Sequence, residues 1–385
     1  MTRPDFTHLP PRQGTLALKL EARQAMFGRA DVLPLWVADM DFAAPDCVRQ
    51  ALIARAEHPI YGYTVRDPDM LPALCDWIGR RHGWQPAPAH ACIAPGVVPS
   101  LYAAVAAFSA PGEGVIVQTP IYPPFLQAVQ TQGRRLLDNP LRCQDGAYSL
   151  DLEHFEQCAR QARLFLLCSP HNPVGRVWSR AELQALLAIC ARHDVIVFAD
   201  EIHADLLYPG EVHQPALPLA PERVVAAWAP SKTFNIPGMG LSALFSEQAA
   251  LMQRLQAIFA ALPVSTQHPF GQVAWTTAYR QAEPWLEALL QTLQGHRQHV
   301  LARLHSELPR LRMSVPQATY LLWLDFQAWG CSEPELVRRL VDEAGLGLNP
   351  GSSFGESGRG WMRLNMATTR TQLDLALDRL IAAFA

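Results

Sequence analysis

Lysine is scarce in this chain of 385 residues: of its 32 basic residues only two, Lys19 and Lys232, are lysines. Arginine carries nearly all the positive charge, and a net charge of −3 leaves no basic excess to attract nucleic acid or an anionic membrane. Apolar runs such as residues 101–108 are too short to cross a bilayer, and the first residues lack the apolar core of a signal peptide. We expect a cytoplasmic protein that acts on a small molecule.

Paired cysteines are also absent. The eight cysteines form no CxxC pair, so the sequence indicates neither a disulfide framework nor a metal site. The chain is instead 49% hydrophobic, which is ample for a large core, and its length predicts two domains.

Short apolar runs alternate with a helical pattern in the middle of the chain. They are rich in β-branched residues and end in turn signals, which is typical of buried strands. Between the second and third runs, Ser179 and Glu182 form a capping box before a helically spaced apolar face. This alternation indicates a mostly parallel sheet with functional residues at the carboxyl ends of its strands. The predicted strands are residues 114–120, 163–170, 195–201, 224–231 and 241–246.

The pattern changes beyond about residue 280. A long amphipathic stretch at 283–308 precedes a strand at 320–326, a second capping box at Ser332 and Glu335, a strand at 361–367 and a final helix. This order predicts a second domain of the α+β type, completed by the N-terminal segment.

Three polar side chains follow successive predicted strands. Asn172 lies in SPHNPVG, Asp200 in ADEIH and Lys232 in PSKTF. Each alone has an ordinary explanation, since asparagine before proline favours turns and aspartate often caps helices. Together at one edge of a sheet, an amide, a carboxylate and an amine match what pyridoxal 5′-phosphate (PLP) requires. Upstream, Gly96 precedes a helix whose first N–H groups are suited to a phosphate.

These motifs together resemble the fold-type I enzymes that depend on PLP, in particular the cystathionine β-lyases of the MalY/PatB type. WVADMDF, YGYT at 61–64, QTPIYPPF at 118–125, PGSSFG at 350–355 and GRGWMRLN at 358–365 extend the likeness over nearly the whole chain. The resemblance implies an α/β fold with a large PLP-binding domain, residues 45–282, around a mostly parallel seven-stranded sheet. Residues 1–44 and 283–385 would form a smaller α+β domain.

The resemblance assigns the central chemistry to four residues. Lys232 would hold PLP as a Schiff base, and a desolvated lysine is a usable nucleophile and base. Asp200 would pair with the pyridinium nitrogen, and Tyr122 would stack on the ring. Arg363 would bind the α-carboxylate of an amino acid substrate, a planar task that suits a guanidinium. The alternative for Arg363 is an exposed charge on a strand.

Further residues would hold the cofactor in place. Asn172 would hydrogen-bond the phenolic oxygen of the ring, with His203 close by. The phosphate would be bound by Gly96, by the backbone amides of Val97 and Val98, and by the hydroxyl of Ser231.

The YGYT motif places Tyr63 where, in the family, a tyrosine of the neighbouring subunit reaches the phosphate. We therefore expect a homodimer with shared active sites, since two-fold pairing is the commonest oligomeric arrangement. The alternative is that Tyr63 is a surface or core aromatic residue in its own chain.

Departures from typical aminotransferases bear on the reaction. Ala229 and Gly240 stand where many aminotransferases carry a serine and an arginine that bind the phosphate, and His203 stands where they carry a tyrosine. The missing arginine and the histidine favour the lyase branch, whereas Ala229 removes one phosphate ligand.

We predict α,β-elimination of L-cystathionine or a related cysteine S-conjugate to pyruvate, ammonia and a thiol. The first alternative is transamination, because the two reactions share a carbanion and diverge through small differences in positioning. The second is a PLP protein that acts mainly as a regulatory binding partner, for which the sequence offers no discriminating feature.

Overall fold

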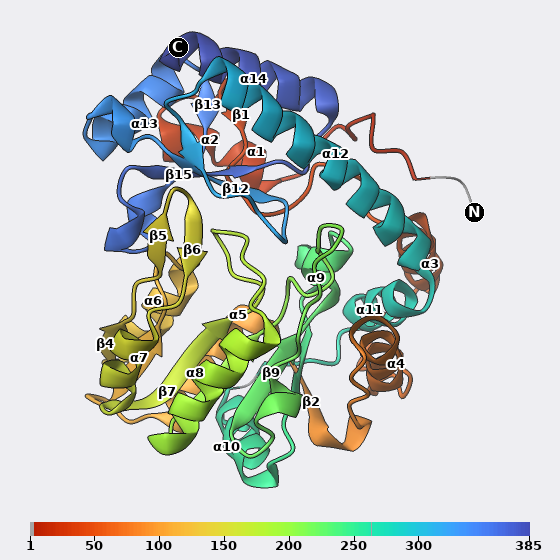
Figure 1. Ribbon diagram of the computed structural model, residues 1–385. Helices are drawn as coiled ribbons and strands as arrows, with labels where there is room; N and C mark the ends of the chain where they lie inside the picture. The colour runs from red at the N-terminus through yellow and green to blue at the C-terminus, as the bar shows by residue number, and fades with distance from the viewer. Residues whose placement is uncertain (1–3, 263) are drawn as a thin grey trace.

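A seven-stranded sheet lies at the centre of the larger part of the computed structural model, which describes residues 4–262 and 264–385 (Figure 1). Adjacent strands are parallel except at β10, which runs antiparallel to both β2 and β9. The predicted mostly parallel α/β fold is therefore confirmed. In spatial order the strands are β2 (Ala91–Ala94), β10 (Ser242–Phe245), β9 (Val224–Trp228), β8 (Ile196–Asp200), β7 (Ala162–Cys168), β3 (Gly114–Val117) and β4 (Arg135–Asp138).

Helices cover both faces of this sheet. Along β8, Val197 and Ala199 pack into one helical layer and Phe198 packs into the other, as the alternation of a strand requires. Both faces are thus buried, which is why the central strands are continuous apolar runs in the sequence. One layer contains α5 (Val97–Phe108), α6 (Pro123–Gln130) and α10 (Ala249–Ala261), and the other contains α3 (Asp46–Glu57), α4 (Met70–His82), α7 (Leu152–Ala159), α8 (Arg180–Arg192) and α11 (Pro269–Gln281).

All five predicted strands are present, and each ends before its predicted last residue. The difference that matters for function is at β9, which stops at Trp228. Ala229 then becomes the N-cap of the short helix α9 (Pro230–Thr233), and Pro230 has no amide hydrogen with which to extend the sheet. Lys232 consequently lies on a helix that follows the strand, and not at the end of the strand itself.

The first predicted capping box is confirmed and the second is only half formed. At the start of α8, the Glu182 amide donates to Ser179 Oγ at 3.2 Å and the Ser179 amide donates to Glu182 Oε2 at 2.8 Å. At the start of α13 (Glu333–Asp342), Ser332 Oγ accepts from the Glu335 amide at 3.4 Å. The reciprocal bond from Ser332 to Glu335 is not formed within the described residues.

A smaller α+β part follows and has an apolar core of its own. Its four-stranded sheet packs with α12 (Glu283–Glu307), α13 and α14 (Arg370–Phe384). The N-terminal segment joins it because β1 (Leu33–Pro34) pairs in parallel with β13 (Leu346–Gly347). A smaller second domain is therefore confirmed, and its boundaries at residues 45 and 283 stay predictions. The strands of the sheet, in order, are β11 (Arg312–Met313), β12 (Leu321–Asp325), β15 (Trp361–Asn365) and β14 (Asn349–Pro350).

The remaining elements are short. Within residues 4–262 and 264–385, no helix combines the length and apolar character needed to cross a bilayer. The short helices and strands include α1 (Leu18–Glu21), α2 (Arg23–Phe27), and the hairpin of β5 (Arg142–Gln144) and β6 (Ala147–Ser149).

Candidate active site

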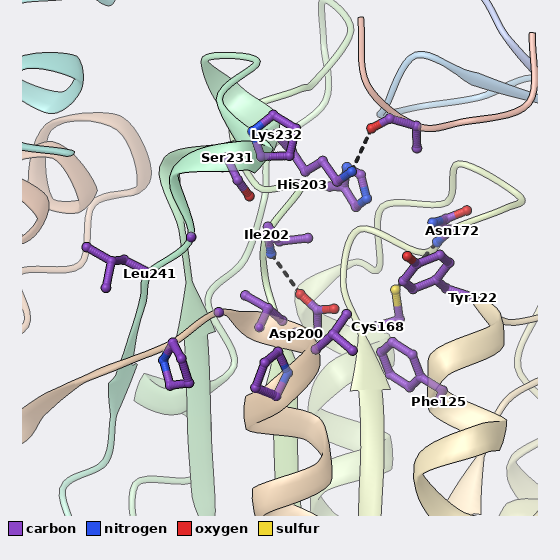
Figure 2. A pocket seen from close by; sticks show the side chains of 18 residues that line it. Tyr122, Phe125, Cys168, Asn172, Asp200, Ile202, His203, Ser231, Lys232 and Leu241 are labelled. Atoms are coloured by element: carbon purple, nitrogen blue, oxygen red, sulfur yellow. Dashed lines mark hydrogen bonds between the residues drawn. The ribbon is translucent and has the colours of Figure 1, made fainter. Parts of the chain in front are cut away.

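A cavity of about 260 Å³ opens where β7, β8 and β9 end, which is the edge at which parallel strands were expected to bring their functional residues together (Figure 2). Every predicted site residue lines it except Arg363 and Tyr63. The predicted residues in its wall are Gly96, Val97, Val98, Tyr122, Asn172, Asp200, His203, Ser231 and Lys232.

Lys232 extends from α9 across this cavity. Its Nζ donates a hydrogen bond to the carbonyl of Ala38 at 2.6 Å, which Figure 2 shows as a dashed line. Burial, followed by the positive charge of Arg363, lowers the pKa of Lys232 to about 8. The amine therefore gives up its proton far more readily than a solvated lysine does, and the neutral amine is the form that attacks a carbonyl or accepts a proton.

Asp200 ends β8 and faces the same cavity. Its Oδ1 accepts a hydrogen bond from the Ile202 amide at 3.1 Å (Figure 2). Burial raises the pKa of Asp200 to about 7, and the charge of Lys232 only partly opposes that rise. A buried carboxylate in this state is stabilised when a cation comes beside it, and the protonated nitrogen of a ring would be such a cation.

The N-terminus of α5 forms another wall. Gly96 is the N-cap with a φ of 143°, a conformation that L side chains rarely adopt, and the described side chains provide no cap for this helix. The N–H groups of Val97 and Val98 have no acceptor within their own helix and lie at the positive end of its dipole. This wall is suited to a phosphate.

Arg363 lies on β15 and is 4% exposed, so the alternative of an exposed strand charge is wrong. Its Nη1 donates to Asn172 Oδ1 at 3.1 Å. Its Nη2 donates to the Trp36 carbonyl at 3.1 Å and to Asn349 Oδ1 at 2.9 Å. The guanidinium also lies over the ring of Phe354, 4.9 Å from its centroid.

The acceptors around Arg363 are all neutral oxygens, which leaves the charge without an anionic partner in the described part of the chain. Its Nε has no hydrogen-bond partner among those residues either. Burial lowers the pKa of Arg363 to about 10, because the charged form is costly in a dry site. A carboxylate of a ligand would supply both the missing charge and the missing acceptor.

Tyr122 and His203 complete the wall (Figure 2). Tyr122 is the N-cap residue of α6, and burial raises the pKa of its phenol. His203 follows β8, and burial lowers its pKa to about 3, which keeps the imidazole neutral. Its Nδ1 has no hydrogen-bond partner in residues 4–262 and 264–385. The neutral ring therefore adds no charge to the cavity wall.

Tyr63 lies outside this cavity, on the loop between α3 and α4. The side chain is fully exposed, so the alternative of a core residue is wrong. Its loop contacts α11 and the segment before it, because Thr64 Oγ1 donates to the Gln267 carbonyl and Gln272 Nε2, on α11, donates to the Val65 carbonyl at 3.2 Å. The loop and the segment before α11 carry exposed apolar side chains, here together called the loop patch: Ile60, Tyr61, Tyr63, Val65, Leu262 and Val264.

The sequence analysis did not anticipate how residues 36–42 would hold the site together. This segment, here called the strap, has carbonyls that accept hydrogen bonds from side chains far away in the sequence. WVADMDF marked the segment as part of the resemblance, but the donors could not be read from it. Trp36 is bonded by Arg363, Val37 and Asp39 by Asn365, Ala38 by Lys232 and Tyr320, and Met40 and Phe42 by Asn235.

Comparison with known proteins identifies the family to which this architecture belongs. The model of the family described as aminotransferase class I and II matches residues 30–380. The chain belongs to this family. It is 40% identical to cystathionine β-lyase PatB of Bacillus subtilis over 386 residues, covering 99% of this chain and 100% of that protein. It is 30% identical to protein MalY of Escherichia coli, with 98% of each chain covered.

Solved structures agree with the family assignment. The crystal structure of cystalysin from Treponema denticola, which contains PLP, matches with a TM-score of 0.95 at 30% identity, covering 99% of this chain and 98% of that one. The cofactor of this family member is PLP. The cavity fits it on two counts: the N–H groups of α5 suit the phosphate, and Asp200 suits a protonated ring nitrogen.

Because the chain has two lysines, the pKa of Lys232 can be measured directly. In cofactor-free protein labelled with ¹³Cε-lysine, the resonance that is missing from Lys232→Ala should titrate with a midpoint of about 8. Arg363→Met removes a nearby positive charge and should raise this midpoint, because a like charge disfavours the protonated amine. A wild-type midpoint of about 10.4, the value of a solvated lysine, would contradict the desolvated site.

Proposed function

We propose that this protein is a PLP-dependent carbon–sulfur lyase that converts L-cystathionine or a related cysteine S-conjugate to pyruvate, ammonia and a thiol. The observation that carries the proposal is one site that contains a buried amine, Lys232, and a buried guanidinium, Arg363, whose acceptors are all neutral. An α-amino acid matches this pair, because Arg363 can bind its carboxylate while Lys232 reaches its α-proton. The identity to PatB supports cystathionine as the reference substrate.

Lys232 is proposed as the residue that links to PLP and as the catalytic base. PLP, when bound, supplies an electron sink that stabilises negative charge on the α-carbon of the substrate. Lys232 Nζ then accepts the α-proton, so that the electron pair left behind can expel a thiolate from the β-carbon. The lowered pKa of Lys232, about 8, suits both tasks, since a larger fraction of the free amine is neutral near physiological pH than for a solvated lysine.

Asp200 and Asn172 would hold the ring in the state that this step needs. Asp200, as the carboxylate, would keep a proton on the ring nitrogen, because separating these two buried charges is unfavourable. Asn172 Oδ1 accepts a hydrogen bond from Arg363, and its Nδ2 group would donate to the phenolic oxygen of the ring. The residue that would touch the ring thus also orients the guanidinium that would bind the substrate.

The residues expected near the phosphate of PLP favour elimination over transamination. Neither Ala229 nor Gly240 offers a side-chain donor, and Gly240 has a φ of 60°, where a larger residue would be strained. The aminotransferase pattern with an arginine at this position is therefore absent from the sequence. Both reactions begin with the same proton transfer, so an experiment must separate them.

The proposed link between Lys232 and PLP has a matched control in the other lysine. Wild-type protein saturated with PLP should be yellow, and borohydride should fix the cofactor to the peptide that contains Lys232. Lys19 is buried and its Nζ lies 2.8 Å from Asp41 Oδ1, so Lys19→Arg should keep the fixed label while Lys232→Ala loses it. A label on the Lys19 peptide, or none at all, would contradict the proposal.

Elimination and transamination are separated by their need for a second substrate. Given L-cystathionine alone, the enzyme should release pyruvate, ammonia and homocysteine in equal amounts, without added 2-oxo acid. Coupled assays for pyruvate and free thiol check this result together. Turnover that depends strictly on a 2-oxo acid and yields a new amino acid would instead make the protein an aminotransferase.

We further propose that the protein is a homodimer and that Tyr63 completes the phosphate site of the partner subunit. Three observations support this. Tyr63 does not line the cavity of its own chain, the side chains of the loop patch are apolar and exposed, and no arginine lines the cavity in the described part of the chain. A two-fold interface would bury the patch and exchange the two tyrosines.

Subunit mixing tests the shared site. When Tyr63→Phe and Lys232→Ala proteins are exchanged, a heterodimer should contain one site with both defects and one site with neither. Activity should then rise above that of either variant alone, given that Tyr63→Phe is itself impaired. Exchange confirmed by mass spectrometry without a rise in activity, or a fully active monomer, would show that each chain builds its site alone.

A further inference from the structure

The turn after β8 contains another buried carboxylate, Asp205, which the proposed chemistry does not use. Asp200 and His203 line the cavity, whereas Asp205 is absent from its lining and is 4% exposed. Asp205 Oδ1 accepts hydrogen bonds from Trp77 Nε1 and from the Nε2 of His82, both at 2.9 Å. Its Oδ2 accepts from the hydroxyl of Thr233 at 2.8 Å.

Asp205 is thus a charged and fully oriented anchor. Burial alone would raise its pKa, but His82, Arg81 and the Thr233 hydroxyl together hold the pKa of Asp205 below its ordinary value. The Nε of Arg81 lies 3.6 Å away and adds positive charge on the same side. A carboxylate that accepts three hydrogen bonds from two separate helices, α4 and α9, cannot turn without losing a bond to one of them.

Thr233, whose hydroxyl donates to Asp205 Oδ2, directly follows Lys232 in the sequence. Helix α9 has four residues, no side-chain cap among the described residues, and too little length to be rigid by itself. Thr233 is 1% exposed, and the next residue, Phe234, packs edge-on against Trp77 at 5.4 Å between ring centroids. The hydrogen bond from the Thr233 hydroxyl to Asp205 therefore connects α9 to the turn after β8.

We propose that Asp205 and Thr233 are positioning residues that fix Lys232 relative to Asp200. One turn would then set both groups: Asp200 directly at its start, and Lys232 through the bond from Asp205 to α9. This inference rests on the proposed role of Lys232 as the residue that links to PLP. Neither Asp205 nor Thr233 needs to touch the cofactor or the substrate.

Precision of this kind matters because a misplacement of about 1 Å in a reacting group can lower a rate by about 100-fold. Thr233→Val keeps the shape of the side chain and removes its hydroxyl. It should lower kcat by roughly 10- to 100-fold while changing KM by less than about threefold, because Arg363, oriented by Asn172, would still bind the substrate. It should also slow, by about tenfold or more, the formation of the borohydride-reducible link after PLP is added to cofactor-free protein.

Two further variants separate positioning from loss of stability. Thr233→Ser restores the hydroxyl and should restore both the rate of link formation and kcat. Thr369→Val makes the same chemical change at the N-cap of α14, where Thr369 Oγ1 accepts from the Gln372 amide at 3.4 Å. Thr369→Val should lower the melting temperature and leave link formation and kcat near wild type.

Asp205→Ala provides an independent test if Thr233→Val does not fold. It removes both acceptor oxygens, whereas an asparagine amide could still donate to the Thr233 hydroxyl, so Asp205→Ala should slow link formation at least to a similar degree. Adding Thr233→Val to it should cause little further loss, since both changes break one bond.

The outcomes distinguish this inference from the proposed function. Wild-type protein that forms no link at Lys232 would contradict the proposed role of that lysine. Wild-type linkage together with wild-type rates in Thr233→Val or in Asp205→Ala would overturn the positioning role alone. Losses that Thr233→Ser does not rescue would also overturn it, because they would reflect packing and not the hydrogen bond.

Discussion

Burial of three ionisable groups around one cavity is the constraint on which the rest of this structure depends. Lys232, Asp200 and Arg363 are all removed from water. Burial lowers the pKa of Lys232 and of Arg363 and raises the pKa of Asp200, and each shift favours the neutral form. The cost of a buried charge is on the order of several kcal/mol unless a partner offsets it. A protonated cofactor ring would supply a partner for Asp200, and a substrate carboxylate would supply one for Arg363. Desolvation that destabilises these charges in the empty site therefore favours binding of groups with the opposite charge.

The strap is where the two parts of the chain meet. Its irregular backbone cannot satisfy its own carbonyls, and buried carbonyls must find donors. Side chains of the large part, Lys232 and Asn235, supply some of these donors, and Arg363 and Asn365 of the smaller part supply others. The site is therefore held as one unit by bonds that cross the molecule, and the arginine proposed to bind substrate is fixed by the backbone beside it.

Within the large part, the turn after β8 organises the chemistry. Asp200 and His203 line the cavity, and Asp205 accepts a hydrogen bond from Thr233 on α9. Such a division lets one short segment present groups to a ligand and also support the helix that holds Lys232. The proposed preference for elimination has a different origin, because it rests on residues 229 and 240, near the expected phosphate, and not on the scaffold. The fold alone, which this family uses for more than one reaction, does not decide between the two.

The sequence by itself determined the α/β class and the five central strands, because periodicity and turn chemistry are local signals. It also brought Asn172, Asp200 and Lys232 to one edge, because strand ends converge in a parallel sheet, and the family resemblance supplied Tyr122, His203 and Ser231. It also singled out Lys232 through the scarcity of lysine. Tertiary structure decided that Arg363 is buried among neutral oxygens, that Lys232 sits on a helix after β9, and that Asp205 and the strap hold the site. The burial of Arg363, the bond to Asp205 and the strap depend on contacts between residues more than 25 positions apart, and no local pattern encodes which donor will meet which acceptor once the chain is packed.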